Sequence, residues 1–352
     1  MLADAPRRYS FLDRDGRPLD LGRSEAFDQH GPRRGPDLDG LTAIVVISAE
    51  RGADTRRCVD SILAGTPEPF EIILSDVGSG PETLEVLKAL EDAHGNIHVI
   101  YNAKSTGTTG QRNQGIFFSR GGHVVLMDND VLVQPGWLGP LLERSAADPR
   151  AGLVGAKLLK AEIEKVYYCG AHTITLEKAG RVYGIGLVKS GPLADLDRND
   201  ASVLREGEVP WYTTTALLAK RRALFEAGGF DDVGDGRGIF IANEDKDLSL
   251  SVRQAGYRIL YCPASEAIHN HDYSKVDRKD AYHSQYRLRM EQIHKDTEYF
   301  LRKWDITYMI EKLPHEDNSR RWDGRELVAV DLDLGSAELR DDVVTLAARA
   351  GG

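Results

Sequence analysis

Hydrophobic and polar positions between residues 41 and 128 alternate between short apolar runs and helical stripes. Short apolar runs rich in branched residues predict buried strands at residues 41–47, 70–74, 97–101 and 124–127. Apolar side chains at helical spacing predict helices at residues 55–64, from Pro81 onward, and at 110–119. Strands that alternate with helices through short links predict an α/β fold, with a mostly parallel central sheet and helices on both faces.

The pattern is less regular after residue 128. It predicts strands at residues 153–159, 173–176, 211–218 and 257–261, and helices at 221–227, 244–255 and within 277–304. Residues 177–209 are rich in Gly, Asp and Lys, which predicts a long loop. Residues 1–40 have no sustained period and predict an extension with one hairpin around residues 14–17. We therefore expect a domain at 41–275, divided near 135, between an extension at 1–40 and a helical extension at 276–352.

Composition limits the possible partners of this chain. A net charge of −10 over 352 residues argues against a nucleic-acid binder, which normally has a basic face. No apolar run is long enough to span a bilayer, and the N-terminus lacks the pattern of a signal peptide. Cys58, Cys169 and Cys262 are far apart, so we expect three buried free thiols and a cytoplasmic location. The chain could also form a homo-oligomer.

The strand at 124–127 leads directly into Asp128, Asn129 and Asp130. Carboxylates at the end of such a strand lie at the carboxyl edge of the sheet, where open α/β folds bind ligands. Hard oxygen ligands at that edge suit Mg²⁺ or Mn²⁺ holding a diphosphate. The alternative is an acidic turn, because Asp and Asn are ordinary turn residues.

Three further segments have polar side chains at the ends of predicted elements. Asp76 follows a strand and could accept hydrogen bonds from a ribose or a base, or could simply start the turn before Gly78. Arg112 lies where a Gly-rich link enters a helix, which suits a phosphate but is also a common loop junction. His269 and His271 follow the last strand, and an imidazole there could complete an oxygen-rich metal site.

The segment Asn243-Glu244-Asp245-Lys246-Asp247 opens a predicted helix. Asn243 is a suitable N-cap, and acids in a first turn are stabilised by the helix dipole. Three carboxylates in four residues exceed what capping needs, so Asp245 is a candidate general base in a cleft. Trp211 could stack on a sugar, although a core position is the common one for Trp.

The order of these signals is more specific than any one of them. Asp76-x-Gly78-Ser79, Asn113-x-Gly115, Asp128-Asn129-Asp130, Gly228-Gly229-Phe230-Asp231, Glu244-Asp245-x-Asp247 and His269 follow one another along the chain. This series resembles the family 2 glycosyltransferases of the GT-A fold over roughly residues 41–274. The resemblance implies a nucleotide-sugar half at 41–135 and an acceptor half at 136–275.

The resemblance also implies roles for single residues. Donor binding falls to Ser48, Glu50, Asp76, Arg112, Asp128 and Asn129. Mn²⁺ or Mg²⁺ falls to Asp128, Asp130 and His269, with His271 a weaker match. Asp245 matches the base of inverting members, and acceptor binding falls to Glu244, Asp247 and Trp211. The chain departs from the family pattern at Ser48-Ala49-Glu50, at Ser105 and at Thr213-Thr214-Thr215, which affects base, sugar and acceptor preference.

The implied reaction is inverting, metal-dependent transfer of a sugar from a nucleotide diphosphate, most simply a UDP-sugar, to a hydroxyl or other nucleophile of a glycan, natural product or peptide. Two alternatives stay open. A nucleotidyltransferase acting on sugar phosphates would also use metal carboxylates, although Gly52-Ala53-Asp54 is a poor version of its Gly-rich loop. A non-catalytic protein that binds nucleotide sugars or carbohydrates would share the donor site.

Overall fold

The computed structural model describes residues 38–102, 105, 107–161, 163–178, 181–189, 193, 195–232, 238–270 and 290–304, with short strand segments near both ends. Only the backbone is described for residues 39, 172–178, 181–189 and 290 and for the terminal strands. Two of those strands, β2 (Phe11–Leu12) and β3 (Pro18–Leu19), pair antiparallel around the predicted hairpin at residues 14–17. Strands β1 (Arg7–Arg8) and β4 (Arg23–Ser24) pair outside them.

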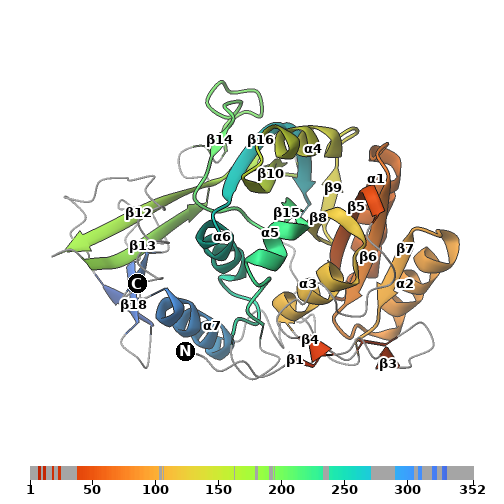
Figure 1. Cartoon of the computed structure of the whole chain (residues 1–352), viewed down its shortest axis with the longest axis horizontal. Helices are drawn as coiled ribbons and strands as arrows, with labels where there is room; N and C mark the ends of the chain where they lie inside the picture. Colours follow the sequence, from red (N-terminus) through yellow and green to blue (C-terminus); the bar gives the residue numbers. More distant parts are fainter. Residues whose placement is uncertain are drawn as a thin grey trace.

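A ten-stranded mixed sheet forms the centre of the molecule (Figure 1). Its first half is parallel, in the order β8-β5-β6-β7. These strands span β5 (Leu38–Ser48), β6 (Phe70–Asp76), β7 (Ile97–Ile100) and β8 (Gly121–Asp128). Residues 43–46 of the middle strand β5 are fully buried, as the apolar run predicts.

Helices cover this parallel half where the sequence predicts them. They are α1 (Gly52–Gly65), α2 (Pro81–Ala93) and α3 (Gly107–Phe118). A further helix, α4 (Leu138–Ala147), was not predicted and packs against β10 and β16 in the other half of the sheet. Pro81 occupies the first turn of α2, as expected from its fixed φ and missing N–H. Gly115 of α3 faces β5 so closely that a Cβ there would lie 2.2 Å from Val45 Cγ1, which explains glycine at this position. The predicted α/β class is therefore confirmed.

The second half of the sheet is mixed. Strand β10 (Ala151–Leu159) runs parallel to β16 (Arg258–His269) and antiparallel to β15 (Ala216–Lys220), which joins it to β8. The short strands β9 (Val131–Val133), β11 (Val166–Tyr168) and β14 (Gly207–Glu208) pair at its margin. Helices α5 (Arg221–Glu226) and α6 (Glu244–Gln254) lie over this half. Gly228 and Gly229, both with positive φ, close α5 as predicted.

Two predictions for this half are wrong in their bounds. The predicted strand at 211–218 begins only at Ala216, and Thr215 directly before it donates a hydrogen bond to Asp128. The predicted loop at 177–209 contains the second strand of a hairpin, β12 (Ala171–Lys178) with β13 (Arg181–Lys189). This hairpin extends away from the main sheet and pairs with β17 (Tyr308–Ile310), which continues into β18 (Ser319–Trp322) and β19 (Leu327–Val330) (Figure 1).

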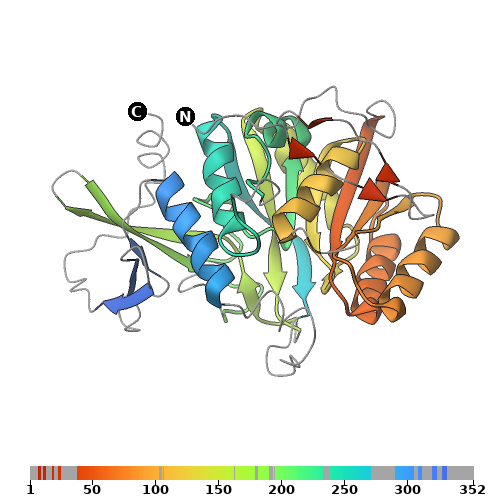
Figure 2. The ribbon, with the colours of Figure 1, turned by 90° about the horizontal axis from the view of Figure 1, so that it is seen from below.

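Helix α7 (Met290–Lys303) is the described part of the helical segment predicted at 277–304. It lies beside α6 in both ribbon views (Figure 1, Figure 2). Phe300, Leu301 and Trp304 on this segment are buried in the common core. No helix among the described residues is both long and apolar enough to cross a membrane. The three cysteines are buried and free, as predicted.

Candidate active site

Asp128 ends strand β8, and Asp130 lies in the turn that leads to β9. The parallel strands carry both carboxylates to the carboxyl edge of the sheet. Thr215 Oγ1 donates a hydrogen bond of 3.2 Å to Asp128 Oδ2. Asn129 Nδ2 donates one of 2.9 Å to Thr55 Oγ1 on α1. The turn is therefore fixed from both sides.

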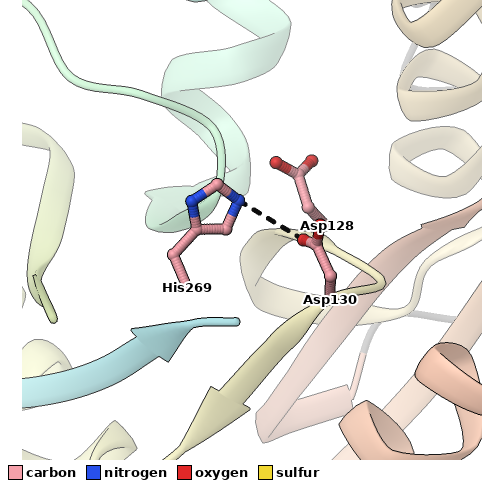
Figure 3. A group of neighbouring side chains, drawn as sticks. All are labelled: Asp128, Asp130 and His269. Carbon is pink, nitrogen blue, oxygen red and sulfur yellow. Dashed lines mark ion pairs between the residues drawn. The ribbon is translucent and has the colours of Figure 1, made fainter. Parts of the chain in front are cut away.

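His269 reaches the same place from the end of strand β16 (Figure 3). Its Nε2 lies 3.4 Å from Asp130 Oδ1, and one ligand atom from each of Asp128, Asp130 and His269 lies within 4.8 Å of the others. Two trans ligands at ~2.1 Å from an ion are ~4.2 Å apart, so small side-chain movements would close this set on one cation. Two carboxylates and an imidazole fit Mn²⁺ or Mg²⁺. His271 lies outside the described residues.

Arginine side chains offset the negative charge. Arg112 on α3 is only 3% exposed, and its guanidinium bridges Asp128 at 2.9 Å and Glu244 at 3.4 Å. Arg51, in the left-handed region at φ 55°, lies 3.2 Å from Asp130. Two planar cations therefore face the candidate metal ligands, an arrangement that suits phosphate oxygens.

These groups line one open pocket with a volume of about 280 Å³. Its polar side consists of Arg51, Arg112, Asp128, Asn129, Asp130, Glu244 and His269. Its remaining lining comes from Ile47, Ala49, Thr108, Ile241, Ala242 and Ile293. Residues from the beginning and from the end of the predicted domain 41–275 therefore line the same pocket. Helix α7, which follows that domain in the chain, contributes Ile293.

The three acids at the start of α6 point to different surroundings. Glu244 lines the pocket, and burial, reinforced by the charge of Asp245, raises its pKa to about 7 against the opposing effect of Arg112. Asp245 does not line the pocket, and its charge adds to the raised pKa of the buried Tyr168. Asp247 is buried and accepts hydrogen bonds from Trp304 Nε1 and Lys303 Nζ at 2.8 and 2.9 Å.

Trp211 belongs to an aromatic cluster with Tyr168. It is 2% exposed, its ring centroid lies 5.9 Å from that of Tyr168, and Lys246 Nζ lies 5.7 Å from its centroid. Trp211 does not line the pocket. The prediction that the Asn243 side chain caps α6 is wrong. Its Oδ1 accepts a hydrogen bond from Lys246 Nζ and makes no capping bond to the helix backbone. The backbone of Asn243 instead turns into the helix at φ 68°.

The predicted nucleoside side is more buried than the sequence indicates. Asp76 is fully buried and accepts the N–H groups of Gly78 and Ser79; burial still raises its pKa. Glu50 accepts from Gly80 N and Thr83 Oγ1 and so holds the start of α2. Ser48 is fully buried and bonds to Thr55. Asp76, Glu50 and Ser48 therefore hold the loops beside the pocket and do not line it.

The first turn of α3 is not open to an anion. Gly107 N is bonded to Ser105 Oγ, and Thr108 N to Phe240 O at 2.8 Å. The interaction of this helix with the pocket therefore falls to Thr108 and Arg112.

Sequence reasoning missed Arg51, Thr215 and Ile293. Arg51 directly follows Ser48-Ala49-Glu50, a segment expected to bind the nucleotide sugar. A cation next to that segment could have been predicted to bind the diphosphate. Thr215 belongs to the Thr213-Thr214-Thr215 run, whose three adjacent hydroxyls were also visible. Ile293 carries no local signal, because its place depends on how α7 folds back.

Comparison with known proteins bears on this geometry. A family model described as Glycosyl transferase family 2 matches residues 43–169. An uncharacterized protein y4gI of Sinorhizobium fredii is 29% identical over 280 residues, which cover 75% of this chain and 27% of that protein. A pre-mycofactocin glycosyltransferase of Mycobacterium tuberculosis is 25% identical over 68% of this chain and 44% of its own length. The chain therefore spans less than half of either relative.

A solved structure of GalNAc-T7 with UDP, GalNAc and Mn²⁺ superimposes with a TM-score of 0.51 and 19% identity, covering 66% of this chain and 43% of that one. At this identity the likeness concerns the fold alone. The matched segment 43–169 contains the parallel half of the sheet and both candidate metal carboxylates. Residues 43–169 of this chain match glycosyl transferase family 2, and its core has the GT-A fold.

Proposed function

We propose that this chain transfers a sugar from a nucleotide diphosphate to an acceptor nucleophile with inversion, and that transfer requires Mn²⁺ or Mg²⁺. One observation carries the proposal: Asp128, Asp130 and His269 converge in a pocket that Arg112 and Glu244 also line. The GalNAc-T7 structure that resembles this fold contains UDP and Mn²⁺, which supports a UDP-sugar as the first donor to test.

Asp128, Asp130 and His269 would hold the cation, which when bound would neutralise charge on the leaving diphosphate. Arg112 and Arg51 lie against these carboxylates and would bind diphosphate oxygens beside them. Asp76 at the end of β6, bonded to Gly78 and Ser79, would hold the turn beside the nucleoside. Ser48, Glu50 and Asn129 would act by holding the loops around that nucleotide.

The proton step falls to Asp245. An acceptor oxygen would attack the anomeric carbon as its bond to the diphosphate oxygen breaks, and Asp245 would take the acceptor proton. Glu244 would bind the acceptor at the pocket side of the same turn. Trp211 would act indirectly on the acceptor side, because its ring contacts Lys246, the residue that follows Asp245. Asp247 would hold the turn in place through Trp304 and Lys303 rather than contact the acceptor.

The test uses the full chain with radiolabelled UDP-, GDP- and dTDP-sugars, with Mn²⁺, Mg²⁺ or EDTA. Even without the acceptor, a transferase should slowly release free sugar from its donor, and EDTA should abolish this release. Binding of UDP without sugar release from any donor would favour a binding protein. Synthesis of the nucleotide sugar from a sugar phosphate would favour nucleotidyl transfer.

Asp245→Asn separates chemistry from binding. Loss of a general base should lower turnover by ~10²- to 10⁴-fold. The Kd for UDP with Mn²⁺, measured by titration calorimetry, should change little because the donor groups lie on other elements. Asp60→Asn on the exposed face of α1 makes the same chemical change away from the site and should be silent. Unchanged turnover in Asp245→Asn would remove Asp245 from the mechanism.

A further inference from the structure

Helix α7 holds the backbone that precedes α6. The carboxylate of Asp296, which is fully buried, accepts three consecutive backbone N–H groups. The donors are Phe240 at 3.0 Å, Ile241 at 2.8 Å and Ala242 at 2.9 Å. An ionised carboxylate bonded to several N–H groups forms stronger hydrogen bonds than a neutral acceptor. One side chain therefore determines where three successive residues lie.

The other side of this segment is attached to α3. Phe240 O accepts hydrogen bonds from Thr108 N and from Thr108 Oγ1, at 2.8 and 3.1 Å. Thr109 Oγ1 donates to Ile239 O. A Cβ on Gly107 would lie 2.5 Å from Phe240 O, so the two backbones touch. Residues 239–243, which we name the bridge loop, thus connect α7 to the helix that carries Arg112.

The bridge loop leads directly into the site. Asn243 Nδ2 donates to Thr297 Oγ1 at 3.1 Å, and the next residue, Glu244, begins α6. Ile241, Ala242 and Glu244 line the pocket together with Ile293 of α7. Any displacement of the bridge loop would therefore move one wall of the pocket and the first turn of α6 together.

We propose that Asp296 is a positioning residue, which holds the bridge loop so that Glu244 and Asp245 face the bound donor and acceptor. The expected effect of Asp296 on turnover rests on the proposed function. Its effect on the position of the bridge loop rests only on the three N–H hydrogen bonds. Asp296 acts through the backbone of residues 240–242 and does not itself line the pocket.

The substitution series Asp296→Asn and Asp296→Ala grades this interaction. Asn keeps one carbonyl oxygen in place, so it can satisfy part of the N–H set without the charge. Ala removes the carboxylate and leaves the three half-buried N–H donors without their acceptor. Leu301→Ala is the matched control for stability, because Leu301 is buried on the same helix. Glu291→Gln, on the exposed face of α7, is the control for charge.

Hydrogen exchange followed by mass spectrometry tests the loop directly and requires no turnover. Amides of residues 240–242 should exchange at least about tenfold faster in Asp296→Ala, and by less in Asp296→Asn, because their hydrogen bonds are weakened or lost. Glu291→Gln should leave this exchange unchanged. Equal exchange in Asp296→Ala and the unmodified chain would overturn the proposal.

Steady-state kinetics tests the consequence. In Asp296→Asn, kcat should fall by ~10- to 100-fold, a typical effect of misplacing reacting groups by about 1 Å. The Kd for UDP with Mn²⁺ should change by less than about threefold, since Asp128, Asp130 and His269 lie on other elements. An equal fall of kcat in Leu301→Ala at the same melting temperature would reduce Asp296 to a structural residue.

The two proposals can fail separately. If the unmodified chain turns over no donor, the proposed function fails, and the exchange experiment still decides whether Asp296 holds the bridge loop. If turnover is normal and Asp296→Ala accelerates exchange without lowering kcat, only the positioning role is lost.

Discussion

The carboxyl group of Glu244 should make the stability of this protein depend on pH in an unusual direction. It lies at the pocket, with a side chain only 15% exposed. Burial is the main cause of its raised pKa of about 7, and the charge of Asp245 adds to it, while Arg112 at 3.4 Å opposes both. The unfolded chain would titrate the same group at its ordinary value of 4.5.

The sign of the effect follows from proton binding. Between pH 4.5 and 7 the folded protein keeps a proton at Glu244 that the unfolded chain has released. The contribution of this group is therefore fully present below about pH 4.5 and is lost as pH rises through 7. Each unit of pKa shift is worth ~1.4 kcal/mol, so the free energy of unfolding should lose roughly 3 kcal/mol across this window. Glu244→Gln stays neutral and should lack this loss.

Urea denaturation followed by circular dichroism, at pH 5, 6, 7 and 8 with EDTA, measures the difference. The stability of Glu244→Gln relative to the unmodified chain should rise by about 2.5 kcal/mol from pH 5 to pH 8. Glu85→Gln, at an exposed position of α2, makes the same chemical change and should give a parallel curve. If the free energy of unfolding of Glu244→Gln also ran parallel to that of the unmodified chain across this pH range, Glu244 would be ionised in the folded protein and its pKa would not be raised.

Three further substitutions test separate parts of the site and the core. Arg112→Lys should raise the Kd for UDP with Mn²⁺ about tenfold, because a single ammonium group cannot span Asp128 and Glu244 as the guanidinium does; calorimetry showing an unchanged Kd would exclude this role. His269→Ala should weaken Mn²⁺ binding in the presence of UDP by about tenfold or more, while His94→Ala, at the end of α2, should not; equal affinities would take His269 out of the metal site. Gly115→Ala should lower the free energy of unfolding by about 1–3 kcal/mol because its Cβ would overlap Val45, and Gly122→Ala, with open space around it, is the control; equal urea midpoints for the two would contradict the packing.

The sequence predicted the parallel half of the sheet because its signals are local. Each strand from β5 to β8 is an apolar run of its own, and the links between strands and helices are short. Asp128 and Asp130 were found for the same reason, since a strand end fixes which edge of the sheet they reach. The strand predicted at 257–261 is too short: β16 continues to His269, which therefore lies at the end of the strand itself and not in a loop after it.

Predictions were wrong where distant parts of the chain determine the local structure. Strand β13 pairs with the adjacent β12, a local signal that the Gly-, Asp- and Lys-rich composition of 177–209 obscured, and its other partner β17 lies more than 100 residues later in the chain. The predicted strand at 211–218 begins only at Ala216, and the residue before it, Thr215, is bonded to Asp128, 87 residues earlier. Neither distant partner could be identified from hydrophobic period alone.

The first turn of α6 shows how the same limit affects the site. Spacing indicates that Glu244, Asp245 and Asp247 share one helical turn, but a turn has several sides, and sequence does not say what lies beyond each. The fold sets Glu244 against Arg112, Asp245 toward Tyr168, and Asp247 against Trp304. All three partners are more than 50 residues away from the turn. In the proposed reaction this turn would combine acceptor binding, proton transfer and anchoring, and it keeps its place because α3 and α7 pack against it. Turnover should therefore be as sensitive to those two helices as to the acids themselves.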